Sequence, residues 1–403
     1  MGGSSDLSSV YYNPGRLALV NEPELLLAGN VFEYSTIKLK ERGQDISSSR
    51  FSLTPSLFAG EFRFGWLGKS RLAYSFLTRS SSEFNTQGRL QNTTPAFPER
   101  PDLEFLADSV RVDQKLSEYW GGVTWATTVG NGIGVGVSTF GALRNQRRLV
   151  QRTILGDFGG IPATSQATAE YRYDHWRALW KLGVGTNLYN WDVGLPVTTP
   201  GLKLFGSGDV AGDRSIAGVP NDLGYRAFVD HRGIASTYKS PWAVGIGGAR
   251  RFDKTHVHLG VEWFDFLALC DVLPADLVTP VIGDGLVDLT VRQESDSVIN
   301  IAAGVAHTFN GKWEGYASIR TDFSTVGDGT ESNLSFTEWN LYHLSVGATV
   351  HTDAADFTAG LILAFGSSNA PPRIEQAEVQ SSYFRVTAIL GFSFGFAEVP
   401  STQ

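Results

Sequence analysis

Residues 382–396 read SYFRVTAILGFSFGF, and this stretch decides the fold. Every second side chain from residue 384 onward is apolar: Phe384, Val386, Ala388, Leu390, Phe392, Phe394 and Phe396. Between them stand Arg385, Thr387, Gly391, Ser393 and Gly395, with Ile389 as the one apolar exception. Successive side chains of a strand point to opposite faces, so one face of this segment is apolar and the other is small or polar. Such a strand can lie in lipid only within a closed barrel, because a barrel leaves no unpaired sheet edge.

The same alternation recurs along the chain. Comparable apolar rows are Ile133/Val135/Val137, Val257/Leu259/Val261/Trp263, Ile299/Ile301/Ala303/Val305 and Phe357/Ala359/Leu361/Leu363/Phe365. Each row is a weak signal by itself, and the repetition is typical of a transmembrane β-barrel. The alternative is a soluble β-sandwich or a lipocalin-like barrel, which would not need so many strands with an apolar outer row and a small or polar inner row.

Turn signals divide the chain into 14 expected strands. We place them near residues 24–40, 51–64, 70–79, 116–129, 132–148, 168–187, 190–206, 237–252, 255–267, 294–309, 312–324, 338–352, 355–366 and 382–396. Tight turns are expected at Gly130-Asn131, Tyr189-Asn190, Asp253-Lys254, Asn310-Gly311 and Asp353-Ala354. The other connections are long and polar, notably 80–115, 149–167, 207–236, 268–293 and 367–381. Short turns that alternate with long loops predict an antiparallel barrel with both termini on the periplasmic side.

Composition agrees with a single large β structure. The 403 residues include 45 glycines and 12% aromatics, but only 18% charged residues. No run of about 18 apolar residues occurs, so no transmembrane helix is encoded. A net charge of −8 argues against nucleic acid as a partner, and the single Cys270 excludes an internal disulfide. Near the strand ends stand tryptophans, some of which we expect in interfacial girdles: Trp120, Trp125, Trp191, Trp242, Trp313 and Trp339.

The segment before the first strand carries a family resemblance. Its element Tyr12-Asn13-Pro14-Gly15-Arg16-Leu17-Ala18 resembles the amino-terminal hatch motif of FadL-like outer-membrane transporters of hydrophobic compounds, including long-chain fatty acids. Thr199-Pro200-Gly201-Leu202-Lys203 is similar to a further stretch of that family, as is Ser240-Pro241-Trp242-Ala243-Val244-Gly245-Ile246-Gly247, which a charged tight turn and Val261-Glu262-Trp263 follow. The resemblance spans essentially the whole chain.

This resemblance implies an all-β, 14-stranded antiparallel transmembrane barrel with a short plug. Residues 1–22 would form a hatch inside the barrel, residues 23–396 the barrel with its extracellular loops, and residues 397–403 a periplasmic tail. Gly15 stands where the family usually has Ala, and Arg16 replaces a Gly. An arginine inside a barrel needs partners, because an unpaired buried charge is costly. Candidate partners are Glu262, Glu314 and Asp322.

Two groups of residues are candidates for binding a ligand. Val10, Tyr11 and Tyr12 beside the Asn13-Pro14 turn could line an inner pocket, with Phe140 and Phe264 inward by alternation. The resemblance implies that the long loop 80–115 helps to receive the ligand. In this loop the candidates are Phe97, Leu103, Phe105 and Leu106, and residues 102–110 could form a short helix. For each loop residue, packing within the loop is an equally good explanation.

A polar head group would require a cation inside the barrel. Inner-face candidates are Arg144, Arg177, Lys181, Arg320 and Arg385, although such arginines more often pair with inner-face acids. His256 and His258 share a face, but without a third ligand a metal site is not expected. His343 and Ser345 also share a face, yet no accompanying acid or oxyanion element is recognisable, so we expect no enzyme.

Together these patterns predict a channel in the bacterial outer membrane for passive uptake of hydrophobic small molecules such as fatty acids or aromatic hydrocarbons. The expected partners are membrane lipid, lipopolysaccharide and the hydrophobic ligand, with a monomeric barrel, no cofactor and no nucleic acid. The alternative is a FadL-like barrel that serves as a scaffold or shuttle for partner proteins in secretion or surface assembly.

Overall fold

The computed structural model describes residues 6–20, 24–41, 44–62, 64–92, 105–327, 330–334, 339–368 and 380–395. Two short helices, α1 (Ser9–Tyr12) and α2 (Pro14–Leu17), precede the strands. The elements of the first half are β1 (Glu24–Glu41), β2 (Gln44–Phe62), the 3-10 turn η1 (Gly65–Leu67), β3 (Ser70–Asn92), β4 (Phe105–Val129), β5 (Ile133–Asp157), β6 (Pro162–Leu188), β7 (Trp191–Thr198), β8 (Leu202–Ala217) and β9 (Tyr225–Ala235). Those of the second half are β10 (Ala243–Phe252), β11 (Thr255–Phe264), β12 (Leu267–Leu273), β13 (Val291–Ser295), β14 (Val298–Asn310), β15 (Trp313–Asp322), β16 (Asn340–His351), β17 (Asp356–Ser368) and β18 (Gln380–Gly395). None of the helices in these residues is long and apolar enough to span a membrane.

The strands close into a ring in which every pair of neighbours is antiparallel. The ring runs β1–β2–β3–β4–β5–β6–β7–β10–β11–β14–β15–β16–β17–β18, and β18 pairs with β1. These are the 14 strands of a closed barrel, so the predicted fold class is confirmed. β8 and β9 continue the sheet from β6 beyond the ring, and β12 pairs only with β13.

The outer surface of the barrel is apolar, as the alternation predicts. In β18, Phe384, Leu390 and Phe394 are 45%, 38% and 39% exposed, whereas Thr387 on the opposite face is 3% exposed. Other exposed outward side chains include Leu259, Val261, Ile299, Ile301, Leu361 and Leu363. A band of this kind is suited to lipid rather than water. Phe396 lies outside the described residues.

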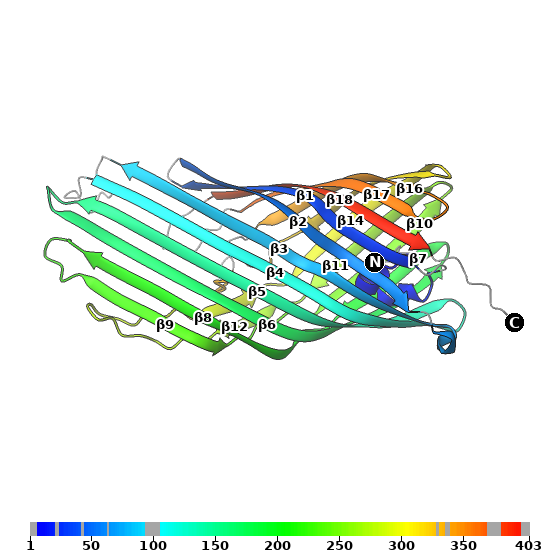
Figure 1. Cartoon of the computed structure of the whole chain (residues 1–403), viewed down its shortest axis with the longest axis horizontal. Helices are drawn as coiled ribbons and strands as arrows, with labels where there is room; N and C mark the ends of the chain where they lie inside the picture. Colours follow the sequence, from blue (N-terminus) through cyan, green and yellow to red (C-terminus); the bar gives the residue numbers. More distant parts are fainter. Residues whose placement is uncertain are drawn as a thin grey trace.

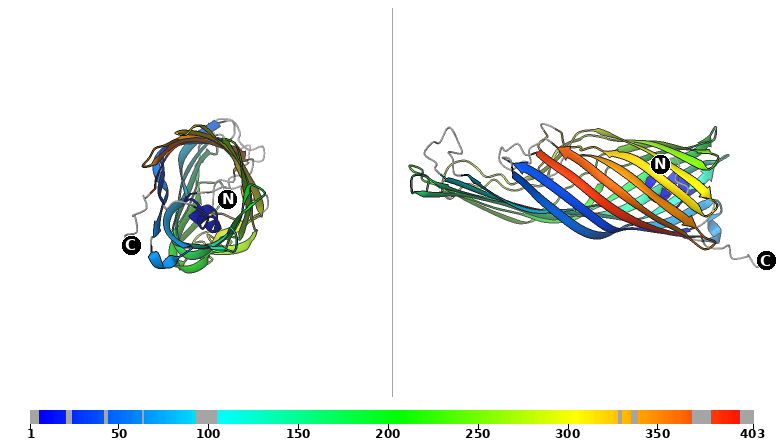
Figure 2. Two further views of the ribbon diagram at one scale, coloured as in Figure 1. Left: turned by 90° about the vertical axis from the view of Figure 1, so that its right-hand side faces the viewer. Right: turned by 90° about the horizontal axis from the view of Figure 1, so that it is seen from above.

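One wall of the barrel is much taller than the other (Figure 1, Figure 2). Strands β3 to β6 contain 23 to 27 residues, and β14 to β17 contain 10 to 13. Long loops predicted at 80–115, 149–167 and 207–236 are therefore largely strand, which corrects the sequence interpretation. The helix predicted at 102–110 is also wrong for its described part, because residues 105–110 belong to β4 and pair with β5. Where water surrounds a sheet, both of its faces can be polar. Backbone hydrogen bonds then hold the strands together without alternating apolar and polar side chains.

The tight turns at the other end of the barrel are where the sequence placed them. Tyr189 and Asn190 have φ angles of 49° and 66°, and Asp253 has 54°. Two consecutive positive φ angles match the type I′ hairpin, whose twist suits the flanking strands. The expected strand 190–206, by contrast, is divided into β7 and β8 at Thr199-Pro200-Gly201, where Pro200 has no N–H to donate to a neighbour.

Neighbouring strands separate in one part of the ring. Among the described residues, β2 and β3 pair only from Leu57–Phe62 to Leu72–Leu77, although both strands continue away from the end with the tight turns. A bulge in β3 lies between Thr78 and Ser80, directly above the last pair. The barrel is thus hydrogen-bonded all round near the turn end and parted between β2 and β3 above it.

Candidate functional site: the barrel lumen

Residues 6–20, here called the N-terminal segment, lie inside the barrel (Figure 2, where they are dark blue). Leu7, Val10, Leu17 and Val20 are at most 5% exposed and form one apolar cluster with Ala59, Ala73 and Ala126 of β2, β3 and β4. The small alanine side chains leave room for helices within the ring. This packing fixes the segment at the turn end of the lumen.

Glycines of the barrel wall bring α2 against the backbone of two strands. Gly134 and Gly136 of β5 and Gly183 and Gly185 of β6 form this surface, here called the glycine cradle. A Cβ on Gly183 would overlap the Oδ1 of Asn13, and one on Gly136 would overlap the carbonyl of Pro14. Only glycine allows so close an approach of one backbone to another.

Asn13 connects the two short helices to the cradle. Its Oδ1 accepts a hydrogen bond from the N–H of Gly15 at 3.1 Å, which caps α2. Its Nδ2 donates to the carbonyl of Val184 at 3.0 Å, between the two cradle glycines of β6. The local turn was foreseeable from Asn-Pro, whereas the anchor on β6 depends on the tertiary fold.

Arg16 finds a partner other than those expected. Its Nη1 lies 3.1 Å from Oδ1 of Asp192 on β7, so the proposed pairing with Glu262, Glu314 or Asp322 is wrong. Asp192 follows the Tyr189-Asn190 turn and pairs with Asn187 of β6. The turn thereby carries a carboxylate to the edge of the cradle, where Arg16 packs over Gly185.

A cavity of about 490 Å³, here called the lumen cavity, lies beside the N-terminal segment. Tyr11, Trp120 and Phe264 supply aromatic lining, and Tyr11 meets Trp120 edge-on with ring centroids 5.9 Å apart. Burial raises the pKa of the Tyr11 hydroxyl, so the ring stays neutral. Aromatic walls with a few charged groups are the usual make-up of a small-molecule site.

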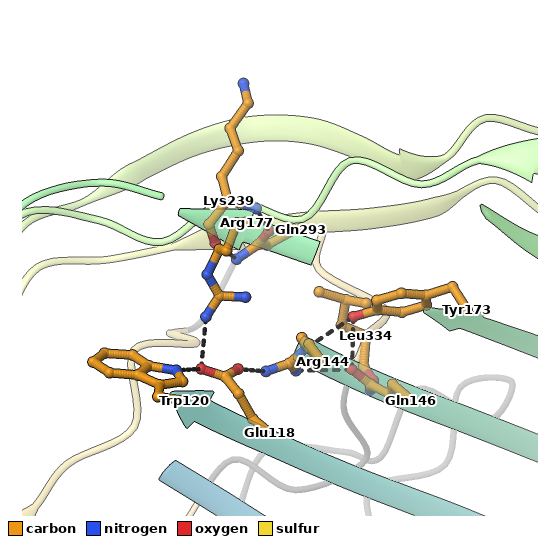
Figure 3. A network of polar contacts seen from close by, with 9 residues as sticks. All are labelled: Glu118, Trp120, Arg144, Gln146, Tyr173, Arg177, Lys239, Gln293 and Leu334. Atoms are coloured by element: carbon orange, nitrogen blue, oxygen red, sulfur yellow. Dashed lines mark hydrogen bonds and ion pairs between the residues drawn. The ribbon is translucent and has the colours of Figure 1, made fainter. Parts of the chain in front are cut away.

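One buried carboxylate organises three residues at this cavity (Figure 3). Glu118 accepts from Nη1 of Arg144 at 3.0 Å, from Nη2 of Arg177 at 2.6 Å and from Nε1 of Trp120 at 2.7 Å. The ring of Tyr238 lies 4.0 Å from the Arg144 guanidinium and 4.9 Å from that of Arg177. Two of the predicted inner-face arginines are therefore engaged in a structural network of the wall.

Lys181 is the predicted cation that this network leaves out. It is 4% exposed and lines the lumen cavity. Its Nζ lies 4.5 Å above the Tyr11 ring, and within the described residues it makes neither a hydrogen bond nor an ion pair. Arg79, from the bulge of β3, and Glu262 also line the cavity. Of the other candidates, Arg385 lies 3.8 Å from Glu33 and Arg320 lies 3.8 Å from Asp322.

The other end of the lumen is covered by an inward-folded cap, which comprises β12, β13 and residues 330–334. Val272, Leu273, Val291 and Leu334 of the cap pack on Tyr171, Tyr173 and Val210 of the wall. Beyond the cap a second hollow of about 560 Å³, here called the outer groove, lies between the tall wall and residues 286–291. Val150, Tyr225, Val229 and Leu289 are among its apolar lining residues.

The predicted site residues are only partly brought together. Tyr11 and Phe264 line the lumen cavity, whereas Val10 is buried in the apolar cluster of the N-terminal segment. Phe140 is fully buried behind Trp120, with ring centroids 5.3 Å apart, and Tyr12 and Pro14 are not part of the cavity lining. Phe97 and Leu103 lie outside the described residues, and Phe105 and Leu106 begin β4 at the top of the wall opposite Asp157 and Gly156.

Trp120 and Trp339 are not among the tryptophans that could form an interfacial girdle. Both line the lumen cavity, and Trp339 donates to Ser381 at 2.8 Å. Trp125, Trp242 and Trp313 are 43%, 45% and 47% exposed on the barrel, as a girdle requires. The strand alternation that puts Glu118 inside also puts Trp120 inside, so this residue could have been found from the sequence.

The histidine pairs provide no catalytic or metal centre in the part of the chain that the structure describes. His256 and His258 have ring centroids 6.2 Å apart, and no group of three potential metal ligands occurs among the described residues. His343 lies 3.7 Å from Asp322, but within the same residues Ser345 makes no hydrogen bond to it.

No protein-family profile and no curated protein sequence matches the chain. Several solved structures match it. The toluene transporter TodX of Pseudomonas putida is 12% identical with a TM-score of 0.65, over 98% of this chain and 95% of that one. A FadL homologue of Pseudomonas aeruginosa is 12% identical with a TM-score of 0.63, over 98% and 96% of the two chains. The monoaromatic hydrocarbon channel CymD is 12% identical with a TM-score of 0.60, over 98% and 94%. At this level of identity the match establishes the architecture, and the chain has the fold of these hydrophobic-compound channels from end to end.

Proposed function

We propose that the chain is a channel of the bacterial outer membrane for passive uptake of hydrophobic small molecules that carry a polar head group. The observation that carries this proposal is the lumen cavity, which lies between the N-terminal segment and the cap. It combines aromatic walls with a buried ammonium group that has no ionic partner among the described residues. The lipid-suited outer surface and the fold shared with named hydrocarbon channels support the location and the class of cargo.

The proposal assigns a role to each part of the chain. Within the proposed hatch (residues 1–22) and barrel (residues 23–396), residues 6–20 and 24–395 contain the described parts, and the periplasmic tail predicted at 397–403 lies outside the described residues. The barrel acts as a monomer surrounded by lipid and, in the outer leaflet, lipopolysaccharide. The solved structures that share this fold are transporters and channels, and we propose that the chain likewise acts as a channel rather than an enzyme.

The cargo would bind with its body against the aromatic rings and its head at Lys181. A carboxylate within reach of Nζ would gain a charge-assisted hydrogen bond in a site of low dielectric. Toluene, the compound that the structural neighbour TodX transports, has no group to pair with this cation. We therefore place aromatic and aliphatic acids ahead of neutral hydrocarbons as cargo.

The route begins at the outer groove and continues to the lumen cavity. From there the parted stretch between β2 and β3 leads sideways into the membrane, since Arg79 and Ser80 beside that parting line the cavity. Displacement of the hatch would open the alternative, periplasmic exit. The two exits differ in whether the N-terminal segment must move.

Uptake of toluene and of 4-methylbenzoate, which differ only in the carboxylate, tests the proposal. Cells with the chain should accumulate 4-methylbenzoate faster than cells with an empty vector. Lys181→Leu should slow this uptake by about tenfold, the value of one charge-assisted hydrogen bond, and leave toluene unchanged. Lys115→Leu on the exposed outer wall is the matched control. Equal uptake with and without the chain would refute the channel, and a stably co-purifying protein would then favour the scaffold.

A further inference from the structure

The outer groove and the lumen cavity lie back to back, with a thin partition between them. Tyr171 and Arg148 line the groove, and Leu334 and Arg144 line the cavity. The hydroxyl of Tyr171 donates to the carbonyl of Leu334 at 2.5 Å, so the two compartments meet across a single pair of residues. Gln146 and Tyr173, 3% exposed each, fill the space beside this pair.

Residues 330–334 of the cap, here called the strap, form one side of this partition. Three side chains of the wall hold two consecutive carbonyls of the strap. Arg148 donates to the carbonyl of Asn333 at 2.5 Å, and Gln146 and Tyr171 donate to that of Leu334, each at 2.5 Å. No ladder of backbone hydrogen bonds joins the strap to the wall within the described residues.

The strap is also attached to the rest of the cap, at and just before β13, by hydrogen bonds separate from those to the wall. Asn333 receives a hydrogen bond from the N–H of Arg292 at 2.7 Å and gives one to the carbonyl of Thr290 at 2.9 Å. Its own N–H donates to the carbonyl of Arg292 at 3.1 Å. The strap can thus leave the wall and remain on the cap, because its bonds to β13 do not depend on Gln146, Arg148 or Tyr171.

We propose that the strap is an outer gate between the outer groove and the lumen cavity, closed by the hydrogen bonds of Gln146, Arg148 and Tyr171. The inference rests on the proposed channel and adds to it a second barrier in series with the N-terminal segment. A molecule in the groove reaches the cavity only when the strap carbonyls exchange these donors for water or for polar groups of the cargo itself. Hydrogen-bond donors suit a gate, because water can take their place at the strap carbonyls when the gate opens.

Ion conductance in planar lipid bilayers tests two barriers in series. Four chains are compared: the wild type, Gly183→Ala to displace the N-terminal segment, Arg148→Met with Tyr171→Phe to release the strap, and the triple variant. Only the triple variant should conduct strongly, at least about tenfold above either parent, because each remaining barrier closes the lumen by itself. Heat-dependent migration on gels confirms that each barrel is folded.

The outcomes separate the gate from the channel. If Gly183→Ala alone conducts as well as the triple variant, the strap is not a gate, and the channel stands. If the triple variant remains closed, release of the strap opens no passage and the gate falls, whereas the channel, whose lateral exit bypasses the N-terminal segment, is judged by uptake alone. Uptake of 4-methylbenzoate is measured independently of these currents.

A labelling experiment tests the gate with the N-terminal segment intact. In a Cys270→Ser background, Ala243→Cys places one thiol in the lumen cavity, where Ala243 is 5% exposed. A membrane-impermeant maleimide added from outside should label it about tenfold faster when Tyr171→Phe is also present. Tyr119→Phe, on the outer face of β4 where its ring stacks on Phe76, is the matched control and should leave the rate unchanged. Equal rates in all three chains would overturn the gate.

Discussion

The two ends of the lumen are closed by different kinds of interaction. At the turn end, the N-terminal segment is held by apolar side chains and by the glycine cradle, where backbones touch. At the opposite end, the cap and the side chains beneath it form a hydrogen-bonded network around Glu118, Gln146 and the strap carbonyls. Where side chains and backbones are closely packed, an added atom is destabilising. In a buried polar network, the loss of one hydrogen-bond partner is destabilising. Substitutions should therefore affect the two ends differently.

The largest effect is expected at the polar end. Glu118→Leu leaves Arg144 and Arg177 buried without their shared carboxylate, which should lower the free energy of unfolding by about 3–5 kcal/mol. Denaturant unfolding in lipid vesicles measures the change. Glu83→Leu, on the outer wall where Lys115 lies 3.9 Å away and both side chains reach water, is the control and should cost at most about 1 kcal/mol. Equal losses for the two variants would show that burial of the Glu118 network contributes nothing.

The apolar end should respond most to an added methyl group. Gly183→Ala overlaps Asn13 and the backbone N–H of Gly15, and overpacking of this kind costs about 1–3 kcal/mol. Because the N-terminal segment can separate from the wall while the barrel stays folded, we expect this variant to make the segment more sensitive to protease. The free energy of unfolding of the barrel should change less. Gly121→Ala is the control, since its Cβ would meet only the Phe76 ring at 3.7 Å. A protected segment in Gly183→Ala would contradict the cradle.

A smaller effect is expected for the ion pair between Arg16 and Asp192 at the apolar end. Asp192 is 43% exposed and its partner Arg16 is 6% exposed, so water can replace the carboxylate in part. Asp192→Asn should destabilise the closed position of the segment by about 1 kcal/mol or less, measurable as faster hydrogen exchange of its amides. A loss as large as that of Gly183→Ala would mean that charge rather than close packing holds the segment.

Several features could be predicted because they depend on neighbours in sequence. The outward rows of β18 and β17 follow from alternation, and the hairpin at Tyr189-Asn190 follows from turn chemistry. The capping bond from Asn13 to Gly15 spans two residues and is equally local. The tall wall escaped prediction, because its upper strands lack an alternating apolar row and are held by backbone pairing with the neighbouring strands, which leaves no pattern in the sequence.

The candidate site was recovered only in part, for a similar reason. Tyr11, Lys181 and Phe264 were identified as inward-facing, yet what distinguishes Lys181 from Arg144 and Arg177 is the position of Glu118 on another strand. Glu118 was not identified from the sequence, because the sequence pattern of an acidic residue on a polar strand face is the same whether or not two arginines contact it. The partner of Arg16 was misjudged because the cradle sets α2 beside β7 rather than beside β11 or β15.

The residues of 382–396 and their counterparts determined by themselves that the chain forms a membrane barrel, since the two-residue period of a strand and the absence of water in lipid leave no other solution. The tertiary structure alone decided what fills the barrel. Which glycines face the N-terminal segment depends on how that segment docks on β5 and β6, far away in the chain. Which arginines share Glu118, and that Lys181 does not, depends on how β4, β5 and β6 align side by side.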